Sequence, residues 1–288
     1  MPDFKSNPNL LTLGLYNNNL EGTIPKYSNP NLRYLAISGN NLEGIVPSLD
    51  SCPNLQQLQL QGNILSAPLP SSNLQILEVS KNHLSAPLPP DFSTIPVLQS
   101  FFAYNNNFSG TLSPTLFYLK NITSVILSGN KNLKGMLPSE LLTPKLENLV
   151  IEGCSFTGPL PTTITSPLIS FYLAGNSFSS SIPSLPKTIH DVSLAYNQIT
   201  GSIPSSFFSD TPFINSFEFR QNKIDSSIPT SVSNLTALTD LKLDLNDFSG
   251  AIPSSIFTWP VFSSPDTSTT VLFGNVWSCP VPDSIRGH

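Results

Sequence analysis

Residues 10–25 read LLTLGLYNNNLEGTIP, and residues 32–47 repeat the same frame as LRYLAISGNNLEGIVP. Both fit the pattern Leu-x-x-Leu-x-Leu-x-x-Asn-x-Leu-x-Gly-x-Ile-Pro, with Ile or Val in place of some leucines. The frame returns eleven times between residues 10 and 253. Because a single unit of this size buries too little surface to fold alone, such self-similarity predicts a solenoid of stacked turns.

An asparagine column gives the period of the repeat, which varies from about 19 to 25 residues, the range of leucine-rich repeats. Asparagine carries two donors and one acceptor on its amide, so it can bond to the backbone of its own turn and of a neighbouring turn. Cysteine replaces asparagine in one repeat, and a degenerate twelfth repeat contributes the last asparagine of the column. The predicted ladder is Asn18, Asn40, Asn63, Asn82, Asn106, Asn130, Cys154, Asn176, Asn197, Asn222, Asn246 and Asn275.

The Leu-x-x-Leu-x-Leu segment alternates with period two, so its leucines point inward and the residues between them point outward from a sheet. The Gly-x-Ile-Pro tail permits a tight reversal and then ends any strand. We therefore predict an α/β solenoid of about twelve repeats, with a parallel concave sheet and short 3-10 or loop segments on the convex side.

The repeats predict one domain over residues 1–288. Residues 1–9 form a truncated N-terminal edge, residues 10–253 hold eleven regular repeats, and residues 254–288 hold a degenerate repeat and a C-terminal cap. About nine residues are too few to cap the open end of a solenoid, so we expect the sequence to begin inside a longer protein. No run of about 18 apolar residues is present, and residues 1–5 do not read as a secretory signal.

The composition argues against several classes of partner. Charged residues make up 11% of the chain and the net charge is -5, whereas a nucleic-acid-binding surface needs clustered Lys and Arg. Three histidines and three cysteines, none closely spaced, support neither a metal site nor a disulfide framework. Cys279 could pair only with a cysteine outside this sequence. No cofactor is expected.

The stretch Asn-x-Leu-x-Gly-x-Ile-Pro, seen at residues 18–25 and 246–253, resembles the plant-specific class of leucine-rich repeats. That class includes ectodomains of receptor kinases, receptor-like proteins and polygalacturonase inhibitors. The resemblance covers residues 10–282 and implies a right-handed superhelix, an extracellular or cell-surface location, and a peptide, glycan or protein ligand with a co-receptor as a further partner. Ala67 and Ala86 depart from its glycine column, as do Ser180 and Ser226.

Solenoids usually bind ligands on the concave face, which the outward residues cover. Exposed aromatic rings there could anchor a peptide or stack on a sugar, although they could also only stack on neighbouring strands. Charges of both signs gather in the last third, where they could bind a ligand or form solvated surface pairs. The candidate ligand-binding residues are Tyr16, Tyr34, Gln57, Gln59, Phe102, Tyr104, Tyr172, Tyr196, Glu218, Arg220, Asp240, Lys242 and Asp244.

His190, Asp191 and Ser193 invite comparison with a catalytic triad, but adjacent strand residues point to opposite faces and no oxyanion motif is present. No catalytic residue is assigned. Asn107, Asn121 and Asn234 match the glycosylation sequon and are candidate glycosylation sites, although a chain this rich in Asn, Ser and Thr would match it by chance about as often.

These observations favour a non-enzymatic recognition module, the ectodomain of a receptor-like surface protein or a fragment of one. Two alternatives stay open. One is a secreted inhibitor of a cell-wall-degrading hydrolase that docks through the charged positions. The other is an adhesion or scaffold protein without a small ligand, which the uneven repeat lengths and nearly neutral surface would suit.

If the aromatic residues of the middle turns form the binding surface, Phe102→Ala combined with Tyr104→Ala should abolish ligand binding and leave the fold intact. Removing both rings takes away rigid apolar contact area without touching the leucine columns. Ligand affinity and the circular dichroism spectrum of the double variant check this expectation. Unchanged affinity would show that these two aromatic rings are not part of the binding surface.

Overall fold

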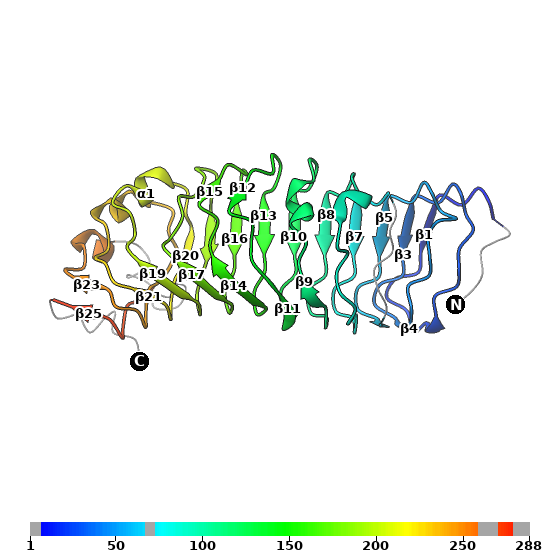
Figure 1. Cartoon of the computed structure of the whole chain (residues 1–288), viewed down its shortest axis with the longest axis horizontal. Coiled ribbons are helices and arrows are strands. Elements are labelled where there is room, and N and C mark those ends of the chain that lie inside the picture. The colour runs from blue at the N-terminus through cyan, green and yellow to red at the C-terminus, as the bar shows by residue number, and fades with distance from the viewer. Residues whose placement is uncertain (1–6, 67–72, 259–269, 279–288) are drawn as a thin grey trace. The chain divides into compact units, whose positions relative to one another are not determined.

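The computed structural model describes residues 7–66, 73–258 and 270–278. The chain divides into two compact units, of which the first comprises Met1–Gly135, Thr143–Leu146 and Gly153–Ser155, and the second Met136–Leu142, Glu147–Glu152 and Phe156–His288. Both consist of short parallel strands at the spacing of the repeat (Figure 1). The predicted leucine-rich-repeat solenoid with a parallel sheet is confirmed. Residues 1–6 of the expected N-terminal edge, Ala67, and the expected cap from Cys279 onward lie outside the described residues.

The main sheet of the first unit takes one three-residue strand from each turn. Neighbouring strands pair in parallel without slippage, so that Leu13 stands opposite Leu35 and Leu35 opposite Leu58. These central residues are 7% exposed or less, because the alternation turns them into the core. The strands are β1 (Thr12–Gly14), β3 (Tyr34–Ala36), β5 (Gln57–Gln59), β7 (Ile76–Glu78), β8 (Ser100–Phe102) and β10 (Ser124–Ile126).

The main sheet of the second unit follows the same rule, with phenylalanine replacing leucine at several central positions. Phe171, Val192 and Phe217 stand in register across three neighbouring strands, and each is fully buried. The strands are β13 (Asn148–Val150), β16 (Ser170–Tyr172), β18 (Asp191–Ser193), β20 (Ser216–Glu218), β22 (Asp240–Lys242) and β24 (Thr270–Val271).

Further strands of two to five residues form a second layer near the Gly-x-Ile-Pro segment of most turns. In the first unit they are β2 (Glu21–Thr23), β4 (Asn41–Gly44), β6 (Ile64–Leu65), β9 (Ser109–Thr111) and β11 (Asn132–Gly135). In the second unit, where β14 starts at the unit boundary, they are β14 (Ser155–Pro159), β17 (Ser177–Ser180), β19 (Gln198–Gly201), β21 (Lys223–Ile224), β23 (Ser249–Gly250) and β25 (Val276–Trp277). β12 (Glu140–Leu141) and β15 (Thr163–Ile164) pair with each other in a separate two-stranded sheet. Ser180 replaces the column glycine yet keeps a left-handed φ of 97°.

In the part of the chain that the structure describes, helix is limited to single turns, as the sequence predicts. Four of these turns are 3-10 helices and one is α-helical, and each buries apolar side chains, such as Phe207 and Phe208 of the α-helix. They are η1 (Phe92–Thr94), η2 (Pro114–Tyr118), α1 (Phe207–Asp210), η3 (Thr230–Asn234) and η4 (Ser254–Thr258). Within the described ranges, no helix has the length and apolar character needed to cross a membrane.

The asparagine column forms the same set of hydrogen bonds in successive turns. The side-chain amide of Asn197 donates to Leu194 O in its own turn and to Leu173 O in the preceding turn, both at 3.0 Å. Its carbonyl oxygen accepts the backbone N–H of Phe178 at 2.9 Å. Because these backbone groups are buried, the amide supplies partners that water cannot.

Cys154 interrupts this pattern within the first unit. Its thiol lies 3.5 Å from Leu127 O, and burial raises the pKa of the thiol to about 11. In the preceding turn the N–H of Leu133, which corresponds to that of Phe178, donates to Asn130 O at 3.0 Å. A thiol can take the donor role of asparagine, but sulfur is a weak acceptor. The Leu133 N–H instead bonds within its own turn, where one extra residue separates Leu133 from the ladder position.

We expect Asn197→Ala to lower the free energy of unfolding by about 2 to 4 kcal/mol, because it leaves buried backbone groups without partners. Asn18→Ala is the matched control, since Asn18 is exposed and, among the described residues, bonds to Leu15 O and Tyr16 O of its own turn. It should cost less than about 1 kcal/mol.

Urea unfolding followed by circular dichroism measures both variants, and hydrogen exchange at the Phe178 amide reports the local loss. Equal destabilisation by the two substitutions, or unchanged protection at Phe178, would contradict the role given to the ladder.

Candidate functional site

The second unit presents an outward surface with a marked excess of acid, which we name the acidic face. It comprises the outward residues of five neighbouring strands and the second residue after each of the first four. Four of its residues are acidic and two are basic, which gives a formal charge of -2. The residues are Asn148, Val150, Glu152, Ser170, Tyr172, Ala174, Asp191, Ser193, Ala195, Ser216, Glu218, Arg220, Asp240 and Lys242.

Tyr172 is the aromatic side chain of this face and lies within the field of several carboxylates. The pairing of strands places Ser193 directly opposite Tyr172, and Glu218 opposite Ser193. Burial raises the pKa of the Tyr172 phenol to about 12, and the charges of Asp191, Glu152 and Glu218 add to that rise. The phenol therefore stays protonated at physiological pH and can donate a hydrogen bond to a ligand.

Glu152 and Asp191 carry charge in an unfavourable setting. Burial raises the pKa of Glu152, and the charge of Glu218 raises it further. Burial also raises the pKa of Asp191, where His190 lowers it and Asp240 raises it. Since the surroundings disfavour both negative charges, a cationic group brought close to them would relieve the repulsion.

The two basic residues of the acidic face already have carboxylate partners. The Lys242 ammonium is paired with Glu218 and lies 3.9 Å from Asp240 Oδ1. Arg220 Nη2 lies 3.1 Å from Asp244 Oδ2, and its guanidinium also lies 5.3 Å from the centre of the Tyr196 ring. These cations therefore offset part of the acid excess from within the face.

The expectation that Asp244 faces outward as a ligand contact is wrong. Its side chain is fully buried, while that of Arg220 is 32% exposed and covers it. Burial raises the pKa of Asp244, and Arg220 opposes that rise. Tyr196 also differs from the strand residues, because it lies in the turn after β18 with a left-handed φ of 54° and remains 45% exposed.

The first unit carries the other candidate residues, which we name the aromatic surface: Tyr16, Tyr34, Gln57, Gln59, Phe102 and Tyr104. Tyr16 is exposed and the other five are half-buried. The Tyr34 hydroxyl donates to Gln59 Oε1 at 2.9 Å, so these two side chains bond to each other. The Lys81 ammonium lies 5.8 Å from the centre of the Tyr104 ring.

Two further sets of residues can be placed. His190 Nδ1 donates to Thr188 O at 2.8 Å, so it holds the backbone and makes no triad hydrogen bond to Asp191 through this nitrogen. Among the sequon asparagines, Asn107 and Asn234 are exposed, while Asn121 is half-buried and accepts a hydrogen bond from the Lys145 ammonium at 3.0 Å.

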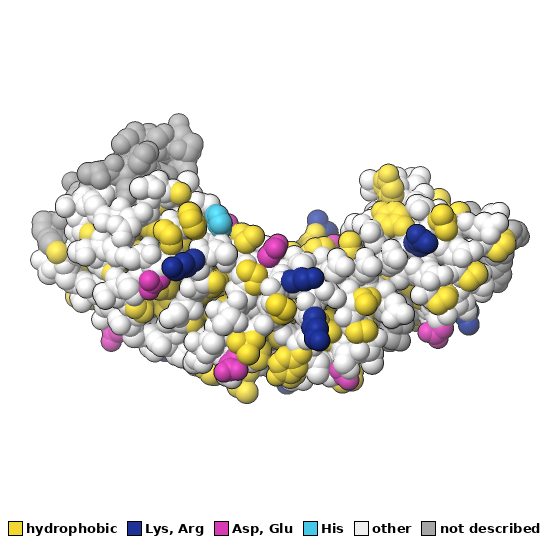
Figure 2. Space-filling model, turned by 90° about the horizontal axis from the view of Figure 1, so that it is seen from above, with side chains coloured by type: hydrophobic (Ala, Val, Ile, Leu, Met, Phe, Trp, Pro, Cys, Tyr) yellow, Lys and Arg dark blue, Asp and Glu magenta, His cyan; other side chains and the backbone are white. Residues whose placement is uncertain are grey.

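Figure 2 shows one face of the molecule, on which charged side chains are few and scattered among uncharged polar ones.

Arg220→Met should lower the free energy of unfolding at pH 7 by about 2 to 3 kcal/mol, since it leaves the Asp244 carboxylate buried without a counter-charge. Without Arg220 the pKa of Asp244 rises further above its unfolded value of about 3.9, so the neutral form favours folding. The loss in free energy of unfolding therefore develops as the pH rises from the unfolded pKa of Asp244 to its folded pKa, and this loss is smaller at about pH 4.

Lys242→Met is the matched control, because both of its carboxylate partners are partly exposed. It should cost less than about 1 kcal/mol with little dependence on pH. Urea unfolding at the two pH values measures both variants. A deficit for Arg220→Met that does not change with pH would show that Asp244 does not need its charge neutralised.

Comparisons with known proteins agree with the repeat and with the fold. Models of leucine-rich repeats match residues 30–71 (a two-copy model) and residues 73–95. Receptor-like protein 39 of Arabidopsis thaliana is 28% identical over 224 residues, which cover 58% of this chain and 25% of that protein. The chain thus spans about a quarter of the length of this relative.

Two solved structures are also similar to this chain. The PEPR1–AtPEP1 complex aligns with a TM-score of 0.78 and 28% identity, covering 88% of this chain and 37% of that chain. The plant peptide hormone receptor RGFR1 in complex with RGF2 aligns with a TM-score of 0.77 and 28% identity, covering 96% and 49%. The chain is a leucine-rich-repeat solenoid similar to plant receptor-like proteins and to the ectodomains of plant peptide-hormone receptors.

Proposed function

We propose that this chain is the recognition part of an extracellular receptor-like protein and that it binds a positively charged peptide on the acidic face. The observation that carries the proposal is the excess of carboxylates there, since both cations of the face already have carboxylate partners. The similar receptors in complex with peptides support a peptide as the ligand class. A co-receptor is a further partner under this proposal, as in the similar HAESA complex that contains SERK1.

The dimensions of the acidic face suit an extended peptide. Neighbouring strands lie about 4.8 Å apart, so β13 and β22 are separated by about 19 Å, the length of about six extended residues. Because the sheet is held by its own ladder, little ordering cost falls on the receptor side.

The proposed role is binding without catalysis. The fold is that of receptor ectodomains, which are typically non-enzymatic. His190 bonds to Thr188 O, and Tyr172 keeps its proton. The acidic face therefore offers hydrogen-bond donors and negative charge to a ligand, and selectivity comes from complementary charge.

The aromatic surface of the first unit is the second candidate binding surface. Phe102 has Ile126 and Glu78 as its direct neighbours across the sheet, and burial raises the pKa of Glu78. The double variant of Phe102 and Tyr104 separates the two surfaces. If cationic peptides lose binding in that variant and keep it when the acidic face is neutralised, the ligand belongs to the aromatic surface.

Peptides selected from a displayed random library on the purified chain should carry a net positive charge. Glu152→Gln combined with Asp191→Asn should then weaken the binding of a selected peptide by about tenfold, because two favourable charge contacts are lost. The same variant should show a weaker dependence of affinity on salt concentration. Isothermal titration calorimetry measures both effects.

Glu21→Gln combined with Glu43→Gln is the matched control, since it removes the same charge from exposed positions of the first unit. It should leave affinity unchanged.

Binding should also weaken as the pH falls through the raised pKa values of Glu152 and Asp191, because protonation removes the attracting charge. Selected peptides without positive charge, or equal losses in both double variants, would overturn the proposal.

A further inference from the structure

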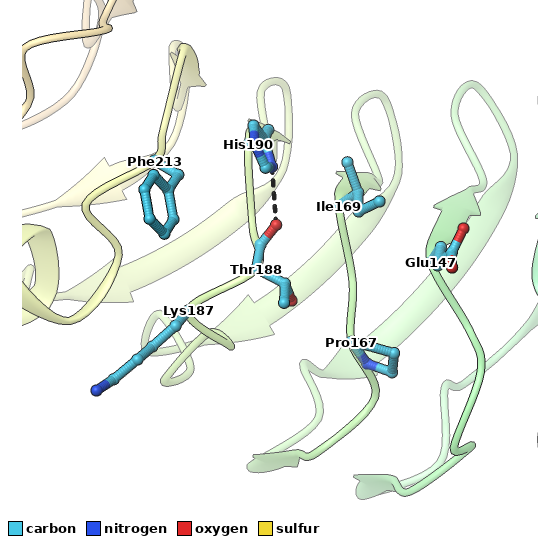
Figure 3. A pocket seen from close by; sticks show the side chains of 7 residues that line it. All are labelled: Glu147, Pro167, Ile169, Lys187, Thr188, His190 and Phe213. Carbon is cyan, nitrogen blue, oxygen red and sulfur yellow. Dashed lines mark hydrogen bonds between the residues drawn. The ribbon is translucent and has the colours of Figure 1, made fainter.

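A pocket of about 340 Å³ lies along the edge of the second unit's main sheet where its strands begin (Figure 3). We name it the edge pocket. It is separate from the outward surface of the acidic face, and its volume is at the lower end of the range for ligand sites. The lining residues are Glu147, Pro167, Ile169, Lys187, Thr188, His190 and Phe213.

The walls of the edge pocket are mainly apolar and partly aromatic. Phe213 is 56% exposed and Ile169 is 37% exposed, so both offer apolar area to a ligand. The His190 and Phe213 rings stack with centroids 6.1 Å apart and an interplanar angle of 15°. The bond from His190 Nδ1 to Thr188 O fixes the imidazole, while the Lys187 side chain extends away from the other lining residues (Figure 3).

The repeat itself does not require these apolar residues. Ile169 directly precedes a strand. The residues that precede β3, β5, β7, β8 and β10 are polar (Arg33, Gln56, Gln75, Gln99 and Thr123), whereas Leu11 precedes β1. Phe213 precedes the first inward residue of its turn, where five turns of the first unit have asparagine (Asn9, Asn31, Asn54, Asn73 and Asn121) and one has Val97. Exposed apolar side chains at normally polar positions indicate a binding surface.

The edge pocket adjoins the acidic face through the backbone. Ile169 N–H donates to Glu147 O at 2.7 Å, and His190 N–H donates to Ile169 O at 2.9 Å, so these three residues lie side by side. Ile169 is followed directly by Ser170, and His190 by Asp191, both of which belong to the acidic face. Asp191 directly follows His190 of the pocket, and its N–H donates to Ile169 O at 3.0 Å, so a carboxylate that would attract a cation adjoins the apolar wall.

We infer that the edge pocket takes a large apolar side chain, aliphatic or aromatic, from the same peptide whose basic residue lies at Asp191. This inference rests on the proposed function, because it assigns a second contact to the proposed ligand. The pocket volume suits one side chain, and the stacked rings present a flat apolar surface to it. The neighbouring Asp191 favours a basic residue next to the apolar one by charge complementarity.

Methyl NMR of the isoleucine residues tests the edge pocket without the unknown ligand. N-acetyl-phenylalanine amide should shift the Ile169 δ1 methyl signal in a saturable way, whereas N-acetyl-serine amide should not. Phe213→Asn should abolish the shift, and it introduces the residue that five other turns carry at this position. Tyr118→Asn, which removes a 70% exposed ring from the first unit, should leave the shift unchanged.

A peptide selected on the wild-type chain gives the second measurement. Replacing its large apolar residue by serine should weaken binding by about tenfold or more on the wild-type chain. On Phe213→Asn, or on Ile169→Gln as a second variant, the two peptides should bind about equally.

The outcomes separate this inference from the proposed function. Two outcomes would overturn the edge pocket and leave the acidic face unaffected. In the first, cationic peptides bind but no probe shifts the Ile169 signal. In the second, serine replacement in the peptide weakens binding equally for the wild-type chain and for both variants. An Ile169 shift with the phenylalanine probe but no binding of cationic peptides would overturn the proposed function instead. A shift caused by methyl glucoside and not by the phenylalanine probe would show that the occupant is a sugar and overturn the assignment to a side chain.

Discussion

The hydrogen bonds of the buried asparagine column are the constraint on which the rest of the structure depends. After each strand the chain changes direction at a point where the backbone groups are buried. Water therefore cannot supply hydrogen-bond partners for these groups. The amide of Asn222 bonds to Leu194 O and Phe219 O, and it accepts the Ile199 N–H. One side chain thus ties each turn to the preceding one. Repeats of uneven length can then stack in register, even where one extra residue follows the ladder position, as between Asn130 and Leu133.

Since the leucine columns and the asparagine ladder carry the stability, the outward residues are released from packing requirements. They differ from turn to turn far more than the inward ones, and in the second unit they accumulate carboxylates. Folding alone gives no reason for this, because the raised pKa values of Glu152 and Asp191 mean that their charges are mildly unfavourable where they stand. Unfavourable charge gathered on one rigid surface is typical of a binding site.

The period of the sequence was sufficient to predict the strands, their inward residues and the ladder, because each depends only on position within one repeat. The burial of Asp244 could not be predicted, since it depends on how far Arg220 of the preceding turn reaches across it. The edge pocket was missed for a similar reason. His190 and Phe213 are separated by 23 positions in the sequence. Their rings meet only because they lie on neighbouring turns at the same edge of the sheet. The signal that could have revealed the pocket is Phe213, at a position where five turns of the first unit have asparagine.

The acidic face and the edge pocket together would select a peptide better than either does alone. A single charge contact in water contributes little, and many unrelated peptides carry a basic residue. An apolar side chain alone would likewise enter a shallow pocket weakly. When both groups occur at a spacing that fits Ile169 and Asp191, the second contact forms with the peptide already held in place, so its ordering cost is reduced. A peptide with the wrong spacing would have to leave one group unsatisfied, and the rigidity given by the ladder prevents the receptor from adjusting to it.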